Sequence, residues 1–147
     1  MRVSIGSDHR GVTLKSELIQ LLSELGHEVS DEGPNSEDSV DYPDYAESVG
    51  RQVADGGCER GVLVCGTGIG MSISANKVPG VRAALCHDEI SATKSREHNN
   101  SNVLCLAADS LESGEAQQLL RLWLETPFEG GRHSRRVEKI NNLDTSG

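Results

Sequence analysis

The chain has 147 residues, of which 35% are hydrophobic and only 3% aromatic, so its size fits one domain with a core of aliphatic side chains. Its formal net charge of −9 argues against sequence-independent binding of nucleic acid, which needs a basic face. Its apolar runs fall far short of the ~20 residues that span a bilayer, so we expect no membrane partner.

The four cysteines, Cys58, Cys65, Cys86 and Cys105, show neither a C-x-x-C spacing nor a Cys/His zinc pattern. Three of them fall in or at the end of apolar, strand-like runs. We therefore expect reduced and mostly buried thiols in a cytoplasmic protein, and no metal site.

Strand and helix signals alternate along the chain. The runs that favour strands are residues 2–7, 27–31, 61–65, 81–86 and 102–106. The segments that favour helices are residues 11–25, 44–54, 71–77, 88–97, 113–125 and 132–143. A polar loop over residues 32–43 and a break over residues 126–131 interrupt the alternation. This order of elements predicts an α/β fold with a five-stranded parallel sheet covered by helices on both faces.

Ligands of such folds bind at the carboxyl ends of the strands, near the point where the strand order reverses. Several polar or glycine-rich segments follow predicted strands directly. They are residues 7–9 (Ser-Asp-His), 65–70 (Cys-Gly-Thr-Gly-Ile-Gly), 87–88 (His-Asp) and 107–109 (Ala-Ala-Asp). We expect these segments to gather at one edge of the sheet and to form a binding site there.

The most informative stretch covers residues 61–77. It passes from an apolar run through Gly66, Gly68 and Gly70 into a predicted helix, a layout that aims free backbone N–H groups at an anion. Cys65 lies at the mouth of this turn, where a helix N-terminus can lower the pKa of a thiol. The stretch therefore offers both an anion cradle and an activatable base or nucleophile.

Two other interpretations of the glycine turn stay open. It is not a Walker A loop, because no Gly-Lys-Ser/Thr follows it. Met71 stands where a dinucleotide fingerprint has its third glycine, although Asp88, about 20 residues further on, keeps a cofactor site possible. A tight turn without a ligand is the second alternative, but three glycines in five residues exceed what a turn requires.

Three further groups are candidates for substrate contacts, and each has a structural alternative. Asp8 and His9 could contact a substrate or form a helix N-cap. His98 falls between the fourth and fifth strand-end segments and suits a general acid, or else is a favourable cation at a helix C-terminus. Arg132 and Arg136 are four residues apart on one helical face, where they could grip one phosphate or form a solvated helix end.

Together these residues resemble the sugar-phosphate isomerase family that contains ribose-5-phosphate isomerase B and the galactose-6-phosphate isomerase subunits. The resemblance runs from Ile5 to about Ile140. It is carried by residues 6–9 (Gly-Ser-Asp-His) with Gly11, 41–43 (Asp-Tyr-Pro), 65–70 with 75–77 (Ala-Asn-Lys), 97–100 (Glu-His-Asn-Asn), and 129–133 (Glu-Gly-Gly-Arg-His) with Arg136 and Val137. Each motif is weak alone, but this order and spacing are highly specific.

The resemblance implies an aldose–ketose isomerase without metal or cofactor, which interconverts ribose 5-phosphate and ribulose 5-phosphate through a cis-enediolate. It implies a Rossmann-like, three-layer α/β/α sandwich over residues 1–147, with a C-terminal helix and tail from about residue 132 that packs on a neighbouring subunit. It also implies a homodimer or homotetramer with active sites at the subunit interface.

The family's reaction centre maps onto the glycine turn. By the resemblance, Cys65 is the base that moves a proton between C2 and C1, and Thr67 assists it. The backbone that would form the anion hole belongs to Gly66, Gly68, Ile69 and Gly70. Some relatives place a glutamate elsewhere as base, so Cys65 puts this chain in the cysteine-using branch.

The family's remaining site residues lie elsewhere in the sequence. By the resemblance, His98 promotes ring opening and Asp8 contacts the sugar. His9, Arg132 and Arg136 hold the phosphate, some of them from the neighbouring subunit. Three further residues would line the site without a defined role: Tyr42, Asn99 and His133.

Three alternatives to this assignment stay open. The substrate could be a six-carbon sugar, allose 6-phosphate or galactose 6-phosphate, which the depth of the pocket would decide. A non-catalytic nucleotide-binding sensor would have no need for Cys65. One half of a hetero-oligomeric isomerase would need a partner chain, although this chain carries base, acid and phosphate ligands itself. The sequence also leaves the pathway open, whether general pentose phosphate metabolism or the use of a rare sugar.

Overall fold

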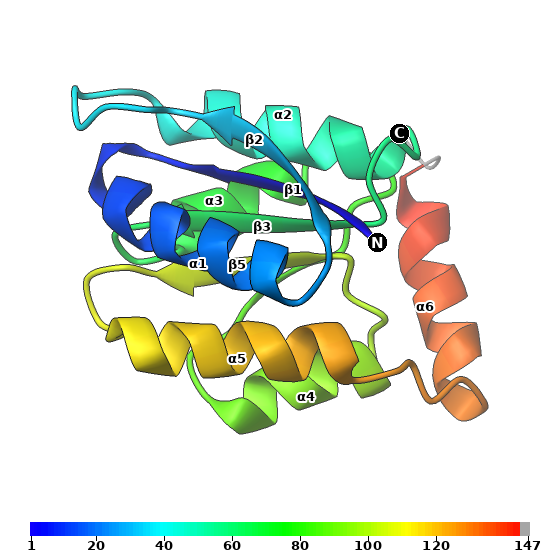
Figure 1. The fold of residues 1–147 in the computed structure, drawn as a ribbon. Helices are drawn as coiled ribbons and strands as arrows, with labels where there is room; N and C mark the ends of the chain where they lie inside the picture. The colour runs from blue at the N-terminus through cyan, green and yellow to red at the C-terminus, as the bar shows by residue number, and fades with distance from the viewer. Residues whose placement is uncertain (145–147) are drawn as a thin grey trace.

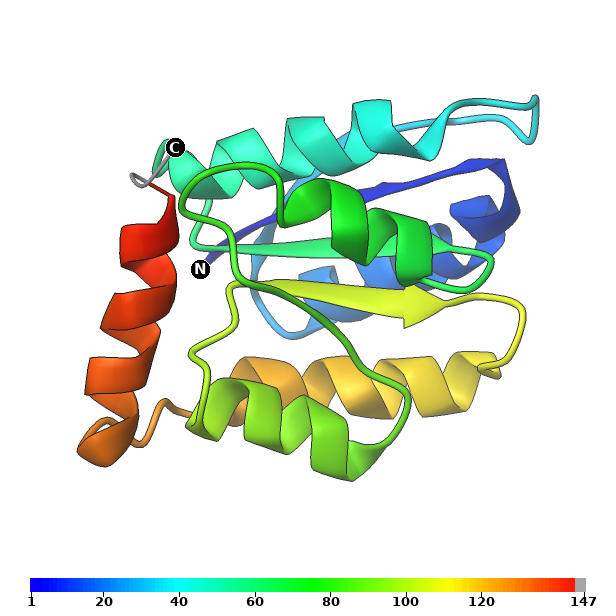
Figure 2. The ribbon, with the colours of Figure 1, turned by 180° about the vertical axis from the view of Figure 1, so that it is seen from behind.

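Five parallel strands form one sheet between two layers of helices in the computed structural model, which describes residues 1–144 (Figure 1 and Figure 2). The strands are β1 (Arg2–Ser7), β2 (Glu28–Gly33), β3 (Arg60–Cys65), β4 (Ala83–Leu85) and β5 (Val103–Ala107). The helices are the 3-10 turn η1 (His9–Gly11), α1 (Val12–Glu24), α2 (Tyr42–Ala54), α3 (Ile69–Ala75), α4 (Glu89–Glu97), α5 (Ser113–Glu125) and α6 (Arg132–Leu143). The strand order β2-β1-β3-β5-β4 confirms the predicted three-layer α/β fold. Residues 145–147 of the expected tail lie outside the described residues.

The central strand β3 is buried on both faces of the sheet. Val62 and Val64 belong to the core that α1 and α5 cover, whereas Leu63 and Cys65 belong to the core under α2 and α3. This division follows from the strand geometry, because successive side chains point to opposite faces. Since β1 and β3 are neighbours and the chain order reverses between them, the last residue of β3 lies at the switch point where such folds bind ligands.

Several element boundaries differ from the prediction, and each difference has a local cause. α2 begins at Tyr42 rather than at residue 44, with Pro43 in the first turn, where the N–H that proline lacks would have no partner anyway. α3 begins at Ile69, inside the glycine turn. β4 is a three-residue edge strand, and the side-chain amide of Asn76 bonds both the N–H and the carbonyl of Ala83, at 2.8 and 3.0 Å. This amide covers an edge that another strand could otherwise extend.

Helix α6 crosses the edge of the sheet at which the strands begin, close to the N-terminus of the chain (Figure 1). Of its side chains, only those of His133 and Val137 are buried. Most of the helix surface is therefore open in this single chain. None of the helices within residues 1–144 combines the length and the apolar character needed to cross a membrane.

Lys15 anchors the loop that leads from β2 to α2. Its side chain is 2% exposed, and its Nζ lies 2.7 Å from both Asp31 Oδ1 and the carbonyl oxygen of Pro34. Further along this loop, the N–H of Val40 donates to Nδ1 of His9 at 3.3 Å. Lys15 therefore fixes the start of the segment that carries the chain past His9.

We expect Lys15→Met to lower the free energy of unfolding by about 1–3 kcal/mol, because the apolar stem stays packed while the two hydrogen bonds of the buried ammonium, to Asp31 and to the Pro34 carbonyl, are lost. The matched control is Lys94→Met, which removes an exposed lysine that pairs with Glu97 at 3.0 Å and should cost less than about 0.5 kcal/mol. Urea unfolding at equal protein concentration compares the two variants. Equal losses of stability would contradict the anchoring role of Lys15.

Candidate active site

The loop that follows β3 is tied to the loop that follows β5. Cys65 pairs with Ala107 in the parallel ladder, the N–H of Ala108 donates to the Cys65 carbonyl at 2.8 Å, and the N–H of Asp109 donates to the Gly66 carbonyl at 3.0 Å. The two strand ends therefore hold each other, and Cys65 sits on a rigid element rather than on a free loop.

The sulfur of Cys65 faces the backbone of the glycine turn. The N–H of Gly68 donates to Cys65 Sγ at 3.2 Å, and α3 starts at the next residue. The N–H of Ile69 donates to the hydroxyl oxygen of Thr67 at 3.3 Å. Two of the amides that we assigned to an anion hole are therefore already engaged by side chains of the same turn.

A cavity of about 360 Å³ opens above this turn. Its walls include most of the residues that the sequence analysis assigned to the reaction centre. The lining residues are Asp8, Arg10, Tyr42, Cys65, Gly66, Thr67, Ile69, Gly70 and Ile73. The segments after β1 and β3 thus meet as expected, and Cys65, although only 4% exposed, lies in the wall of the cavity.

All four cysteines are buried, but Cys65 alone among them lies in the wall of the cavity. Cys86 and Cys105 are inside the two cores, and burial raises the pKa of both thiols. Burial also raises the pKa of Cys58. A thiol held protonated in an apolar core is inert, which leaves Cys65 as the candidate for proton transfer.

Asp8 forms the helix N-cap that was weighed for it and also lies in the wall of the cavity. Its carboxylate accepts a hydrogen bond from the N–H of Arg10 at 2.9 Å and so caps η1, yet its side chain also lines the cavity. His9 is half-buried, and Nδ1 accepts the N–H of Val40, so Nε2 is the nitrogen left for a ligand. The ring of Tyr42 lies against Gly70, where an added Cβ would come within 2.6 Å of it.

The segment after β4 does not join this cavity. His87 and Asp88 line a separate cavity of about 460 Å³ between α4 and α5. Because β4 is the edge strand and β5 lies between it and β3, the end of β4 is displaced from the other strand ends. Our expectation that all the strand-end segments gather at one site was therefore wrong for residues 87–88.

A second group of candidate residues lies at the opposite edge of the sheet. His98 ends α4, and its ring stacks on that of His133 in α6, with centroids 4.2 Å apart and planes inclined by 13°. Burial lowers the pKa of His133, as do the nearby positive charges of His98 and Arg132, so we expect it to be neutral at pH 7. Arg132 and Arg136 lie on the same helix and are exposed.

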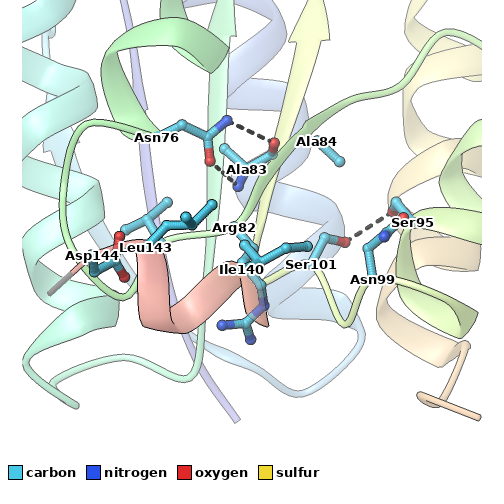
Figure 3. A pocket seen from close by; sticks show the side chains of 11 residues that line it. Asn76, Arg82, Ala83, Ala84, Ser95, Asn99, Ser101, Ile140, Leu143 and Asp144 are labelled. Atoms are coloured by element: carbon cyan, nitrogen blue, oxygen red, sulfur yellow. Dashed lines mark hydrogen bonds between the residues drawn. The ribbon is translucent and has the colours of Figure 1, made fainter. Parts of the chain in front are cut away.

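Asn99 belongs to this second edge. It lines a cavity of about 420 Å³ between α6 and the start of β5, together with Ile140 and Leu143 of α6 (Figure 3). The hydroxyls of Ser95 and Ser101 bond each other at 2.9 Å across its wall. Among residues 1–144, no residue lines both this cavity and the one at Cys65.

The length of the strands separates the two groups. His98 and Asn99 precede β5, whereas Cys65 pairs with the last residue of β5. Five strand residues span roughly 13 Å at about 3.3 Å per residue. A single chain therefore does not bring His98, Asn99, Arg132, His133 or Arg136 to Cys65.

His98, Glu129 and His133 offer ligand atoms within 4.8 Å of one another, the one such group among residues 1–144. Nε2 of buried His133 has no hydrogen-bond partner and lies 3.5 Å from a carboxylate oxygen of Glu129. The two imidazole planes are almost parallel, however, so their nitrogen lone pairs lie in separate planes and do not converge on one ion. The geometry fits aromatic stacking better than metal coordination.

Sequence reasoning missed Arg10 and Ile73 in the wall of the cavity at Cys65. Arg10 directly follows the Asp8-His9 pair, which was a usable signal. Ile73 lies one helical turn after Ile69, on the same face of α3, and both side chains are more than half exposed.

Gly68 offers a test of the turn, because its φ is +76° and an added Cβ would lie 3.2 Å from the backbone carbon of Leu106. We expect Gly68→Ala to lower the free energy of unfolding by more than about 2 kcal/mol, since backbone strain adds to a clash with β5. Gly26→Ala is the matched control, because the φ of Gly26 is +88° but nothing lies within 4 Å of the new Cβ. We therefore expect it to lower the free energy of unfolding by only about 1–2 kcal/mol. Chemical denaturation measures both, and a smaller loss at Gly68 would contradict the packing.

Comparison with known proteins agrees with this geometry. A family model described as Ribose/Galactose Isomerase matches residues 3–140. The chain is 48% identical over 145 residues to the putative sugar phosphate isomerase YwlF of Bacillus subtilis, covering 98% of this chain and 97% of the relative. It is 43% identical over 143 residues to ribose-5-phosphate isomerase B of Escherichia coli, covering 97% and 96% of the two chains.

A solved structure of ribose-5-phosphate isomerase B from Clostridium thermocellum superposes with a TM-score of 0.97 at 46% identity, over 99% of this chain and 98% of that one. Both the sequence and the fold therefore match over nearly the full length. The chain belongs to the ribose/galactose isomerase family of sugar-phosphate isomerases.

Proposed function

We propose that the chain is a ribose-5-phosphate isomerase, acting over its whole length as one domain, with Cys65 as the base. The observation that carries the proposal is the position of Cys65 Sγ. It lies at the carboxyl end of the central strand, in the wall of a cavity, with the N–H of Gly68 donating to it at 3.2 Å. A donor aimed at the sulfur stabilises negative charge there, as a proton-abstracting thiolate requires.

The reaction needs only a proton to move. In the open-chain aldose, the Cys65 thiolate takes the proton from C2, the C2–H electron pair forms the C1=C2 bond, and the carbonyl pair moves onto O1. The resulting cis-enediolate loses the hydroxyl proton of O2 to O1 and regains a carbon-bound proton at C1, which gives the ketose. No electron leaves the substrate, so the chain's own acid and base groups suffice.

Thr67 is placed to assist at the substrate oxygens. Its hydroxyl oxygen already accepts the N–H of Ile69, so its O–H is directed by that bond and can donate to O1 or O2. Thr67 is exposed and lines the same cavity as Cys65. Donors near O1 lower the barrier, because O1 gains the negative charge in the transition state.

We propose that each complete site needs two chains. The Cys65 edge of one copy would face the His98 edge of another, and a twofold axis would repeat the arrangement to give two sites per homodimer. Large apolar side chains are exposed at both edges, Ile69 and Ile73 on α3, and Ile140 and Leu143 on α6. Exposed apolar surface of this kind suits an interface between subunits.

The second chain would supply the groups that open the ring and hold the phosphate. His98 would exchange a proton with the ring oxygen, while the stacked and neutral His133 fixes the plane of its imidazole. Arg132 and Arg136, one turn apart on an open helix face, would grip the phosphate together with His9. Phosphate binding remote from C1 and C2 fixes the orientation of the reacting carbons.

Ribose 5-phosphate is the substrate we place first, because the relatives from E. coli and C. thermocellum are named for it. The six-carbon sugars share the same first steps and differ in the length that the cavity must accept. The sensor alternative is weaker, because it gives no reason for a thiol in the wall of the cavity.

Isomerisation by the purified chain, with a metal chelator present, tests the proposal. We expect turnover of ribose 5-phosphate to exceed that of allose 6-phosphate, and Cys65→Ser to lower kcat/KM at least about 1000-fold, because the alkoxide of serine is not accessible as a base. Cys58→Ser, a change of the same size away from the cavity, should keep most of the activity. Full activity of Cys65→Ser would overturn Cys65 as the base, and a preference for allose 6-phosphate would replace the substrate.

A further inference from the structure

Arg10 lies in the wall of the Cys65 cavity without a role in the mechanism above. It belongs to η1, directly after β1, and its side chain is 57% exposed. Among the residues that line this cavity it is the one cation, whereas Asp8 adds a carboxylate. In a chain of net charge −9, an anion that reaches Cys65 therefore meets one local positive charge from this copy of the chain.

Asp109 holds the Arg10 guanidinium beside the glycine turn. Nη2 of Arg10 donates to Oδ2 of Asp109, whose backbone N–H is in turn bonded to the Gly66 carbonyl at 3.0 Å. Within residues 1–144, Asp109 is the partner of the Arg10 side chain, which leaves the N–H groups of Nε and Nη1 available. The pair joins positions 99 residues apart.

Gly66 leaves room for the Arg10 guanidinium because it has no side chain. A Cβ on Gly66 would lie 3.1 Å from Nε of Arg10 and 2.8 Å from Oδ2 of Asp109. The guanidinium therefore occupies the space of the missing side chain, at the residue that directly follows Cys65. Arg10 is therefore a charged donor in the wall of the same cavity as Cys65.

The backbone of the turn alone leaves a shortage of donors for the enediolate. The Gly68 N–H is directed at Cys65 Sγ, and the Ile69 N–H at the Thr67 hydroxyl oxygen. Beside the Thr67 hydroxyl, a charged donor at O1 would stabilise the developing negative charge further. The Arg10 guanidinium keeps N–H donors on Nε and Nη1 and stays charged throughout the reaction.

We propose that Arg10 is a catalytic residue that donates hydrogen bonds to the enediolate oxygens in the Cys65 cavity. The inference rests on the proposed isomerase reaction. No proton passes to Arg10: Cys65 takes the proton from C2, the electron pair ends on O1, and Arg10 stabilises that charge. Its contribution therefore grows between the ground state and the transition state.

Steady-state kinetics of Arg10→Gln tests this role. Loss of an oxyanion donor should lower kcat on ribose 5-phosphate about tenfold to a hundredfold and leave KM within about twofold, because the lost contact is made in the transition state. Arg10→Lys keeps the charge but loses the planar guanidinium. Its kcat should therefore lie between that of Arg10→Gln and that of the unaltered protein. Arg51→Gln is the matched control, since Arg51 is also an exposed arginine in an ion pair, with Glu47 at 2.9 Å, and should keep kcat. A raised KM with unchanged kcat in Arg10→Gln would overturn the proposal.

Equilibrium binding separates this inference from the proposed function. The probes are 4-phospho-D-erythronohydroxamate, a planar mimic of the enediolate, and ribitol 5-phosphate, which has the phosphate but no carbonyl. We expect Arg10→Gln to weaken the hydroxamate about tenfold or more and ribitol 5-phosphate less than about twofold. If the protein did not turn over ribose 5-phosphate but Arg10→Gln still weakened the hydroxamate more than ribitol 5-phosphate, the proposed substrate would be wrong and the role of Arg10 would stand. Equal weakening of both probes, or no weakening, would overturn it.

Discussion

The hydrogen bond from the Gly68 N–H to Cys65 Sγ is the contact on which the site depends. It requires Gly68 at positive φ, with no side chain, packed against the backbone of β5. It also requires β3 to end at Cys65, which the ladder with β5 and the bonds from Ala108 and Asp109 enforce. The sheet thus presents one thiol in a fixed direction, and burial raises the pKa of the other three.

In the proposed mechanism, the catalytic groups are divided between the two edges of the sheet. Cys65 lies at the edge where the strands end, and His98 lies at the edge where they begin. This is because α4 runs back across the sheet before β5 starts. A helix that returns antiparallel to the strands necessarily carries its C-terminal residue to the opposite edge. The exposed face of α6 and the exposed isoleucines of α3 then gain a common explanation, since a second copy would cover both and complete the site.

Much of the fold and of the candidate site could be predicted from the sequence, and the predictions that were wrong or incomplete have identifiable causes. The alternation of elements predicted the layers, and the glycine turn after Cys65 predicted where a cavity would lie, because both are local patterns. The ion pair of Arg10 with Asp109 joins residues that only the sheet brings together, so no spacing could reveal it. His98 was placed between two strand ends although the predicted helix over residues 88–97 returns antiparallel to the strands and so ends at the opposite edge of the sheet. The amides of Gly68 and Ile69 looked free, since their side-chain acceptors become visible only in the folded turn.

Complementation between two inactive variants tests most directly whether the site is shared between chains. Cys65→Ala removes the base at one edge, and His98→Gln removes the acid at the other. We predict that an equimolar mixture of the two, unfolded and refolded together, recovers about a quarter of the unaltered activity, because one site in four then combines an intact Cys65 with an intact His98. If the mixture stayed as inactive as its components, each site would be complete within one chain, and the two-edged account would be contradicted.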